Sequence, residues 1–111
     1  MKYFDVLILE EAFEFLKSLD ETHAEKILYN IRKAQLVKDP RLFKKLKNEI
    51  WEFRTLFKGN QYRLLAFWNK SNATNSRVII SNGLVKKSSK LPEIEFLKAI
   101  SIRTIYIKQQ N

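Results

Sequence analysis

Three short segments rich in strand-forming residues follow one another in the second half of the chain, and no other feature limits the choice of fold as much. Residues 49–57 alternate between apolar and polar side chains, and residues 61–68 follow after a turn signal at 58–61. A polar stretch, 69–76, separates this pair from a third predicted strand, 77–81, which contains the apolar run 78–80. Because short turns join antiparallel neighbours, the sequence predicts a three-stranded antiparallel meander.

A strand and two helices are predicted before the meander. Residues 3–9 are apolar and rich in strand formers. Residues 10–19 place Phe13 and other apolar side chains at helical spacing, behind acids in the first turn. A second helix ends at about Val37, shortly before a proline. Residues 41–48 form a basic connector with apolar anchors.

A helix is predicted at the end of the sequence. Pro92 lies just before residues 93–108, which repeat apolar side chains at helical spacing. The β-branched residues 102–107 are also compatible with a strand, so their conformation stays open. These elements define an α+β fold of strand, helix and helix, followed by the meander and a C-terminal helix. With 111 residues, we expect a single domain spanning residues 1–111.

The charge of the chain is unevenly distributed. The formal net charge is +9. Residues 1–30 carry seven acids and three bases, whereas residues 31–111 carry 18 bases and five acids. A segregated basic region is the electrostatic signature of a polyanionic partner, of which nucleic acid is the commonest. A basic surface that only maintains solubility is the alternative.

The composition excludes several classes of protein. Without cysteine, the chain has no disulfide framework, no thiolate metal site and no thiol nucleophile. No apolar run approaches the roughly 18 residues of a membrane span, and the acids near the N-terminus are unlike a signal peptide. We therefore expect a cytoplasmic protein without a membrane partner.

Residues 83–92 (GLVKKSSKLP) place three lysines and two hydroxyls between an apolar strand and a helix. Such a junction leaves side chains and backbone N–H groups accessible to a ligand, and this chemistry suits phosphate. Lys86, Lys87 and Lys90 are therefore candidates for phosphate binding, or for proton transfer if neighbouring cations depress the pKa of one of them. A solvated lysine loop is the alternative.

A second group of charged residues lies within the predicted strands. Glu52 and Arg54 project to the same side, because strand side chains alternate. If residues 49–57 and 61–68 pair across their turn, Arg54 lies near Arg63. Two guanidiniums on one face repel each other unless an anion lies between them. The anion is either Glu52, in a structural network, or a substrate phosphate.

The single histidine, His23, is predicted to be a surface residue rather than a catalyst. The chain therefore lacks the paired histidines of a two-histidine ribonuclease. It also lacks a cluster of metal ligands and any cofactor motif, so we expect neither a metal nor a small-molecule cofactor.

Three segments, in order, resemble the RelE/HigB superfamily of bacterial type II toxins, and most closely its phage-derived HigB-like branch. Residues 43–54 (FKKLKNEIWEFR) resemble its K-x-L…x-E-L/F-R strand, and residues 62–65 (YRLL) its Y-R-V/L strand. Residues 82–92 (NGLVKKSSKLP) are similar to its G-F-x-K-K-x-x-K-x-P ending, with Leu84 in place of the commoner Phe. The resemblance covers essentially the whole chain and implies a RelE-like fold.

The resemblance implies an mRNA interferase, an endoribonuclease that cleaves mRNA in the ribosome without a metal ion. A ribose 2′-OH would attack the adjacent phosphate. The implied partners are mRNA, the ribosome and a cognate helix-turn-helix antitoxin of the HigA type. The rival readings are a non-catalytic RNA- or DNA-binding module and an inactive toxin-like partner of an antitoxin.

The resemblance and the residue chemistry together yield a hypothesis for the site. Arg54 and Arg63 hold the scissile phosphate, and Lys86 or Lys87 stabilises charge or moves protons. Glu52 acts either as the base or as a structural partner of Arg54. The lysines expected to contact RNA backbone are Lys44, Lys45, Lys47 and Lys90.

Overall fold

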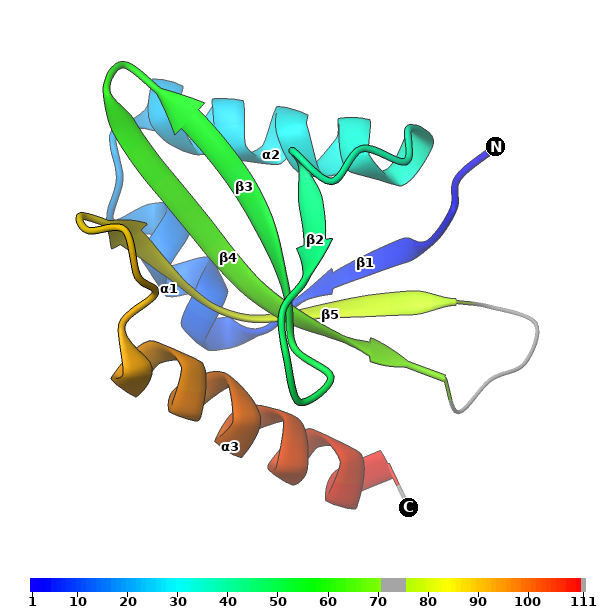
Figure 1. Cartoon of the computed structure of the whole chain (residues 1–111). Helices are drawn as coiled ribbons and strands as arrows, with labels where there is room; N and C mark the ends of the chain where they lie inside the picture. The colour runs from blue at the N-terminus through cyan, green and yellow to red at the C-terminus, as the bar shows by residue number, and fades with distance from the viewer. Residues whose placement is uncertain (71–75, 111) are drawn as a thin grey trace.

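The computed structural model of the protein describes residues 1–70 and 76–110 (Figure 1). In these residues the chain forms an α+β fold of five strands and three helices. The elements follow in the order β1 (Asp5–Ile8), α1 (Glu10–Lys17), α2 (Glu21–Leu36), β2 (Phe43–Lys45), β3 (Trp51–Phe57), β4 (Asn60–Asn69), β5 (Arg77–Lys86) and α3 (Glu93–Gln110).

The strands form one sheet in the order β1-β5-β4-β3-β2. Its centre is the predicted meander, because β4 pairs antiparallel with both β3 and β5. The predicted N-terminal strand is also present as β1, and it pairs in parallel with β5 at one edge. At the other edge, Phe43 of β2 lies opposite Phe53 of β3. The sequence predicts only a connector there, so β2 is a correction.

β5 is longer than the sequence predicts. The predicted strand stops at Ser81, whereas β5 continues to Lys86. Asn82 and Gly83 belong to residue types that are depleted in strands, but pairing with β4 supplies their backbone partners. Ser81 is the extra residue of a bulge, and its hydroxyl donates a hydrogen bond to the Leu65 carbonyl at 3.0 Å.

The helices cover both faces of the sheet (Figure 1). Helices α1 and α2 bury Leu16 and Ile27 against one face, together with Leu64 of β4. Helix α3 buries Phe96 against the other face, together with Leu65. Successive residues of β4 therefore enter different cores, as the two-residue period of a strand requires.

Two of the predicted helices change in detail. α1 ends at Lys17 rather than at residue 19, and Phe13 is exposed, because Ala12 and Leu16 form its buried face. α3 is helical to Gln110, which settles residues 102–107 as helix rather than strand.

Most of the predicted polar segment 69–76 lies outside the described residues. Across the described part of the chain, no helix has both the length and the apolar character that a membrane span needs.

A two-residue turn, Lys58–Gly59, joins β3 to β4 within the predicted turn signal at 58–61, and β4 begins at Asn60, one residue earlier than predicted. Lys58 and Gly59 both have positive φ angles, 49° and 81°. Positive φ at both central residues defines the type I′ turn, whose twist matches that of the paired strands. The turn sets the register in which Phe57 lies opposite Asn60, and every cross-strand neighbour further along follows from it.

Gly83 fills a position where α1 approaches the sheet closely, and we expect its replacement by alanine to destabilise the fold. A Cβ atom at this position would overlap the Phe15 ring and lie 2.5 Å from Leu64 Cδ2. Overpacking of this kind typically costs about 1–3 kcal/mol. Urea denaturation of Gly83→Ala measures the loss. In the double variant with Phe15→Leu, the combined loss should be smaller than the sum of the single losses. An additive result would show that the contact does not matter.

Candidate functional site

The strand register places the predicted arginines and one predicted lysine on a single face of the sheet. Arg54 lies opposite Arg63, and Leu56 lies opposite Gln61. Gln61 in turn lies opposite Lys86. Directly opposed residues of antiparallel strands share a face, as do residues two apart along one strand. Arg54, Arg63 and Lys86 are therefore neighbours near the β3–β4 turn.

A buried carboxylate holds the two arginines. Glu52 Oε1 lies 3.2 Å from Arg63 Nε, and Glu52 Oε2 lies 3.9 Å from Arg54 Nε. The Glu52 and Arg63 side chains are 8% and 5% exposed, whereas that of Arg54 is 34% exposed. The predicted structural network of these three residues is thus present. Of the two guanidiniums, Arg54 has the greater access to solvent.

Arg63 is fixed by further contacts. Its Nη1 donates a hydrogen bond to the Tyr62 carbonyl at 3.1 Å, and its Nη2 donates one to Gln61 Oε1 at 3.0 Å. Burial lowers the pKa of Arg63 from its ordinary value, an effect that Glu52 opposes and Arg54 reinforces. Because a guanidinium stays charged in proteins, the site keeps a fixed positive charge beneath Arg54.

Residues of this group line two hollows. One has a volume of about 300 Å³ and is lined by Arg41, Arg54 and Arg63, among others. The second, of about 520 Å³, is lined by Lys86 and Lys87, together with Ser88, Ser89 and the β3–β4 turn. Gln61 lines both hollows, so they share a wall.

The lysines of residues 83–92 differ in their placement. Lys86 is the last residue of β5 and is half-buried, which corrects the prediction that it belongs to a loop. Lys87 and Lys90 follow the strand and are exposed. The Ser88 hydroxyl donates a hydrogen bond to the Lys90 carbonyl at 3.0 Å, across a bend at residues 88–90.

The lysines of the 41–48 segment do not share one surface. Lys44 lies opposite Glu52 and therefore on the face of the arginines. Lys45 is one residue further along β2, on the other face, with its Nζ 3.9 Å from Glu49. Lys47 Nζ lies 5.0 Å from the centre of the Phe96 ring of α3.

Comparison with known proteins identifies the family of this basic α+β chain. Residues 14–104 match the family described as phage derived protein Gp49-like (DUF891). The chain belongs to the Gp49-like family. This is a family of proposed toxins of the RelE/HigB type. No curated protein matches the chain.

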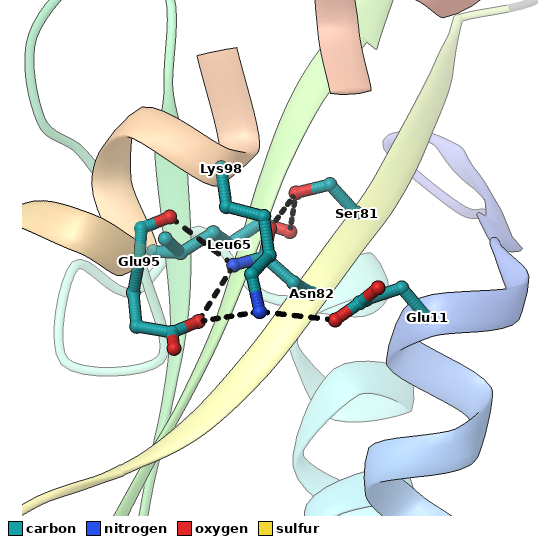
Figure 2. A network of polar contacts seen from close by, with 6 residues as sticks. All are labelled: Glu11, Leu65, Ser81, Asn82, Glu95 and Lys98. Carbon is teal, nitrogen blue, oxygen red and sulfur yellow. Dashed lines mark hydrogen bonds and ion pairs between the residues drawn. The ribbon is translucent and has the colours of Figure 1, made fainter. Parts of the chain in front are cut away.

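A polar network anchors the helix that follows the lysine segment of this Gp49-like protein (Figure 2). Asn82 Nδ2 of β5 donates hydrogen bonds to the main-chain oxygen and to Oε1 of Glu95, at 3.2 and 3.1 Å. Lys98 donates one to Glu11 of α1 at 3.1 Å, which raises the pKa of Lys98. The first turns of α3 are thus tied to β5 and α1, so residues 87–92 are held at both ends.

His23 is not the surface residue that the sequence predicts. It is half-buried, with Nδ1 2.6 Å from the Tyr62 hydroxyl and its ring packed edge-on against Phe57. Tyr62 points away from Arg63, because neighbouring residues of a strand face opposite sides. His23 therefore supports the α2 side of the sheet, away from the hollows.

The sequence gives no signal for four residues that line the arginine hollow, which are Arg41, Thr55, Leu56 and Gln61. Arg41 is placed there because the Arg54 backbone N–H donates a hydrogen bond to the Leu42 carbonyl. Arg41 itself hydrogen-bonds to Asp39, which lowers the pKa of that carboxyl group. Leu56 and Gln61 could have been found only by extending the hairpin register to this face.

In the described residues, no three His, Cys, Asp or Glu side chains are grouped to hold a metal ion.

Proposed function

We propose that this protein is the toxin of a type II toxin–antitoxin system and acts as an mRNA interferase of the RelE/HigB type, in its HigB-like branch. Membership of the Gp49-like family supports a toxin. The element order and the sheet are consistent with a RelE-like topology. The observation that carries the enzymatic assignment is the Arg54–Arg63 pair, which lines one hollow next to the Lys86–Lys87 hollow.

The proposed reaction is transphosphorylation within RNA. The 2′-oxygen of one ribose bonds to the adjacent phosphorus as the bond from phosphorus to the 5′-oxygen of the next nucleotide breaks. The 2′ proton leaves to a base, and the departing 5′-oxygen takes up a proton. The products are a 2′,3′-cyclic phosphate and a 5′-hydroxyl, and the reaction needs no metal ion or cofactor.

Arg54 and Arg63 supply charge stabilisation for the phosphorane in this proposal. Arg54 is exposed enough to place its guanidinium against the non-bridging oxygens of the phosphate. Arg63, which is more deeply buried, adds a fixed positive charge beside it. Lys86 or Lys87 moves protons or stabilises charge from the adjoining hollow. Glu52 already contacts both guanidiniums, which favours a structural role over that of a base.

The proposed partners are mRNA, the ribosome and a HigA-like helix-turn-helix antitoxin in the cytoplasm. The toxin family implies an antitoxin. Lys44 and Lys90 are exposed near the hollows and would contact RNA backbone, as would Lys45 and Lys47 on more distant surfaces.

Mapping of RNA ends in cells that express the protein tests this function. We expect growth arrest and new 5′ ends within mRNA, detected by primer extension, and relief of both when the antitoxin is co-expressed. Growth arrest without new 5′ ends would instead support the non-catalytic nucleic-acid-binding module. That alternative is favoured by one observation, the ion pairing of both arginines with Glu52.

A further inference from the structure

We propose that the two hollows form one track for single-stranded RNA, in which successive phosphates lie on either side of Gln61. The arginine hollow takes the scissile phosphate, and the lysine hollow takes a neighbouring phosphate. This inference rests on the proposed function and adds a second phosphate subsite and a dividing residue, Gln61.

The sheet register sets the spacing of the two subsites. Arg54 and Arg63 form one cross-strand row, and Leu56, Gln61 and Lys86 form the next row on the same face. Rows two residues apart on a strand are separated by about 6.8 Å. Successive phosphates of an extended single strand are separated by a comparable distance. An RNA strand that crosses the rows can therefore place one phosphate in each hollow.

The chemistry of both hollows suits phosphodiesters. The arginine hollow offers the forked guanidinium of Arg54, which reaches solvent, and the remaining donors of Arg41, whose Nε and Nη2 are held by Asp39. The lysine hollow offers the ammonium groups of Lys86 and Lys87 and the hydroxyl of Ser89, whereas the Ser88 hydroxyl already donates to the Lys90 carbonyl. A free phosphate would occupy one hollow, whereas a polynucleotide can occupy both at once.

Gln61 is suited to the wall between the subsites. Its side-chain oxygen accepts a hydrogen bond from Arg63 Nη2, so the carboxamide is tied to the arginine network. Its two amide N–H groups can donate hydrogen bonds to a phosphate oxygen. Gln61 is itself exposed and adds no charge, so it can contact the strand between two anionic groups without repelling either.

Binding of a non-cleavable RNA tests the track. A fluorescent 2′-O-methyl RNA hexamer is titrated with the protein by fluorescence anisotropy over a series of salt concentrations. Each phosphate neutralised on a single strand contributes about −0.7 to the slope of log K against log salt. Two subsites therefore predict a slope of about −1.4 or steeper. Gln61→Glu keeps an oxygen for Arg63 but adds negative charge at the wall. We expect it to weaken binding on the order of tenfold and to flatten the slope.

Gln109→Glu is the matched control, because it adds the same charge at an exposed position near the end of α3. It should bind like the wild type. Gln61→Lys provides the opposite sign and should tighten binding, so the idea remains testable if Gln61→Glu fails to fold. Equal affinities for Gln61→Glu, Gln61→Lys and Gln109→Glu would overturn the track. If the wild type cleaves mRNA while these variants bind alike, only the track is wrong. If the wild type neither binds nor cleaves RNA, the proposed function is wrong as well.

Discussion

Arg54→Ala is expected to reduce the rate of RNA cleavage by on the order of 100-fold or more. Removal of one preorganised donor that stabilises transition-state charge typically has an effect of this size. Arg54 is the more exposed of the two guanidiniums held by Glu52, and it lines the hollow. Its loss would leave the buried Glu52–Arg63 pair intact. The rate is measured from the appearance of new 5′ ends in an mRNA substrate with ribosomes present.

Two further variants sharpen this test. Arg54→Lys keeps the charge but loses the forked donor, so its rate should lie between those of the wild type and Arg54→Ala. Arg32→Ala removes an exposed arginine from α2, on the other side of the sheet, and should leave the rate unchanged. A wild-type rate for a folded Arg54→Ala protein would show that the cleavage site lies elsewhere.

Glu52→Ala is expected to destabilise the fold by roughly 3 kcal/mol or more, which is the usual result when one partner of a buried ion pair is removed. The Glu52 and Arg63 side chains are 8% and 5% exposed and meet at 3.2 Å. Without the carboxylate, the buried Arg63 guanidinium would face Arg54 with no compensating charge. The free energy of unfolding from urea denaturation measures the loss.

The source of that destabilisation can be separated from a general effect of charge. Glu49→Ala removes an exposed carboxylate whose contact with Lys45 is 3.9 Å long, and it should change stability by less than about 1 kcal/mol. A double variant, Glu52→Leu with Arg63→Met, should recover much of the stability, because neither charge is then left alone. A Glu52→Ala loss no larger than that of Glu49→Ala would contradict the buried pair.

The hairpin chemistry was predictable because it is local. The two-residue period of residues 49–57 places Glu52 and Arg54 on one face, and the glycine turn sets Arg54 opposite Arg63. Whether Glu52 or a phosphate lies between the arginines was not predictable. That depends on how deeply the hairpin is buried, and burial is a property of the packed sheet.

The lysine segment shows the opposite case. Asn82 and Gly83 have low strand propensity, so the sequence ends the strand at Ser81, whereas pairing with β4 extends it to Lys86. That extension moves Lys86 from a loop to the row of Gln61. No sequence pattern marks Gln61 as a site residue, because a glutamine beside a turn has no distinctive signature.

By itself, then, the sequence determined the α+β class, the order of the elements other than β2, the antiparallel meander and the pairing of Arg54 with Arg63, because period and turn type act over a few residues. The tertiary structure alone decided that β1 joins β5 in parallel, that β2 forms an edge and that the arginine and lysine hollows meet at Gln61. Those features depend on contacts between residues far apart in the chain, and no local pattern encodes them.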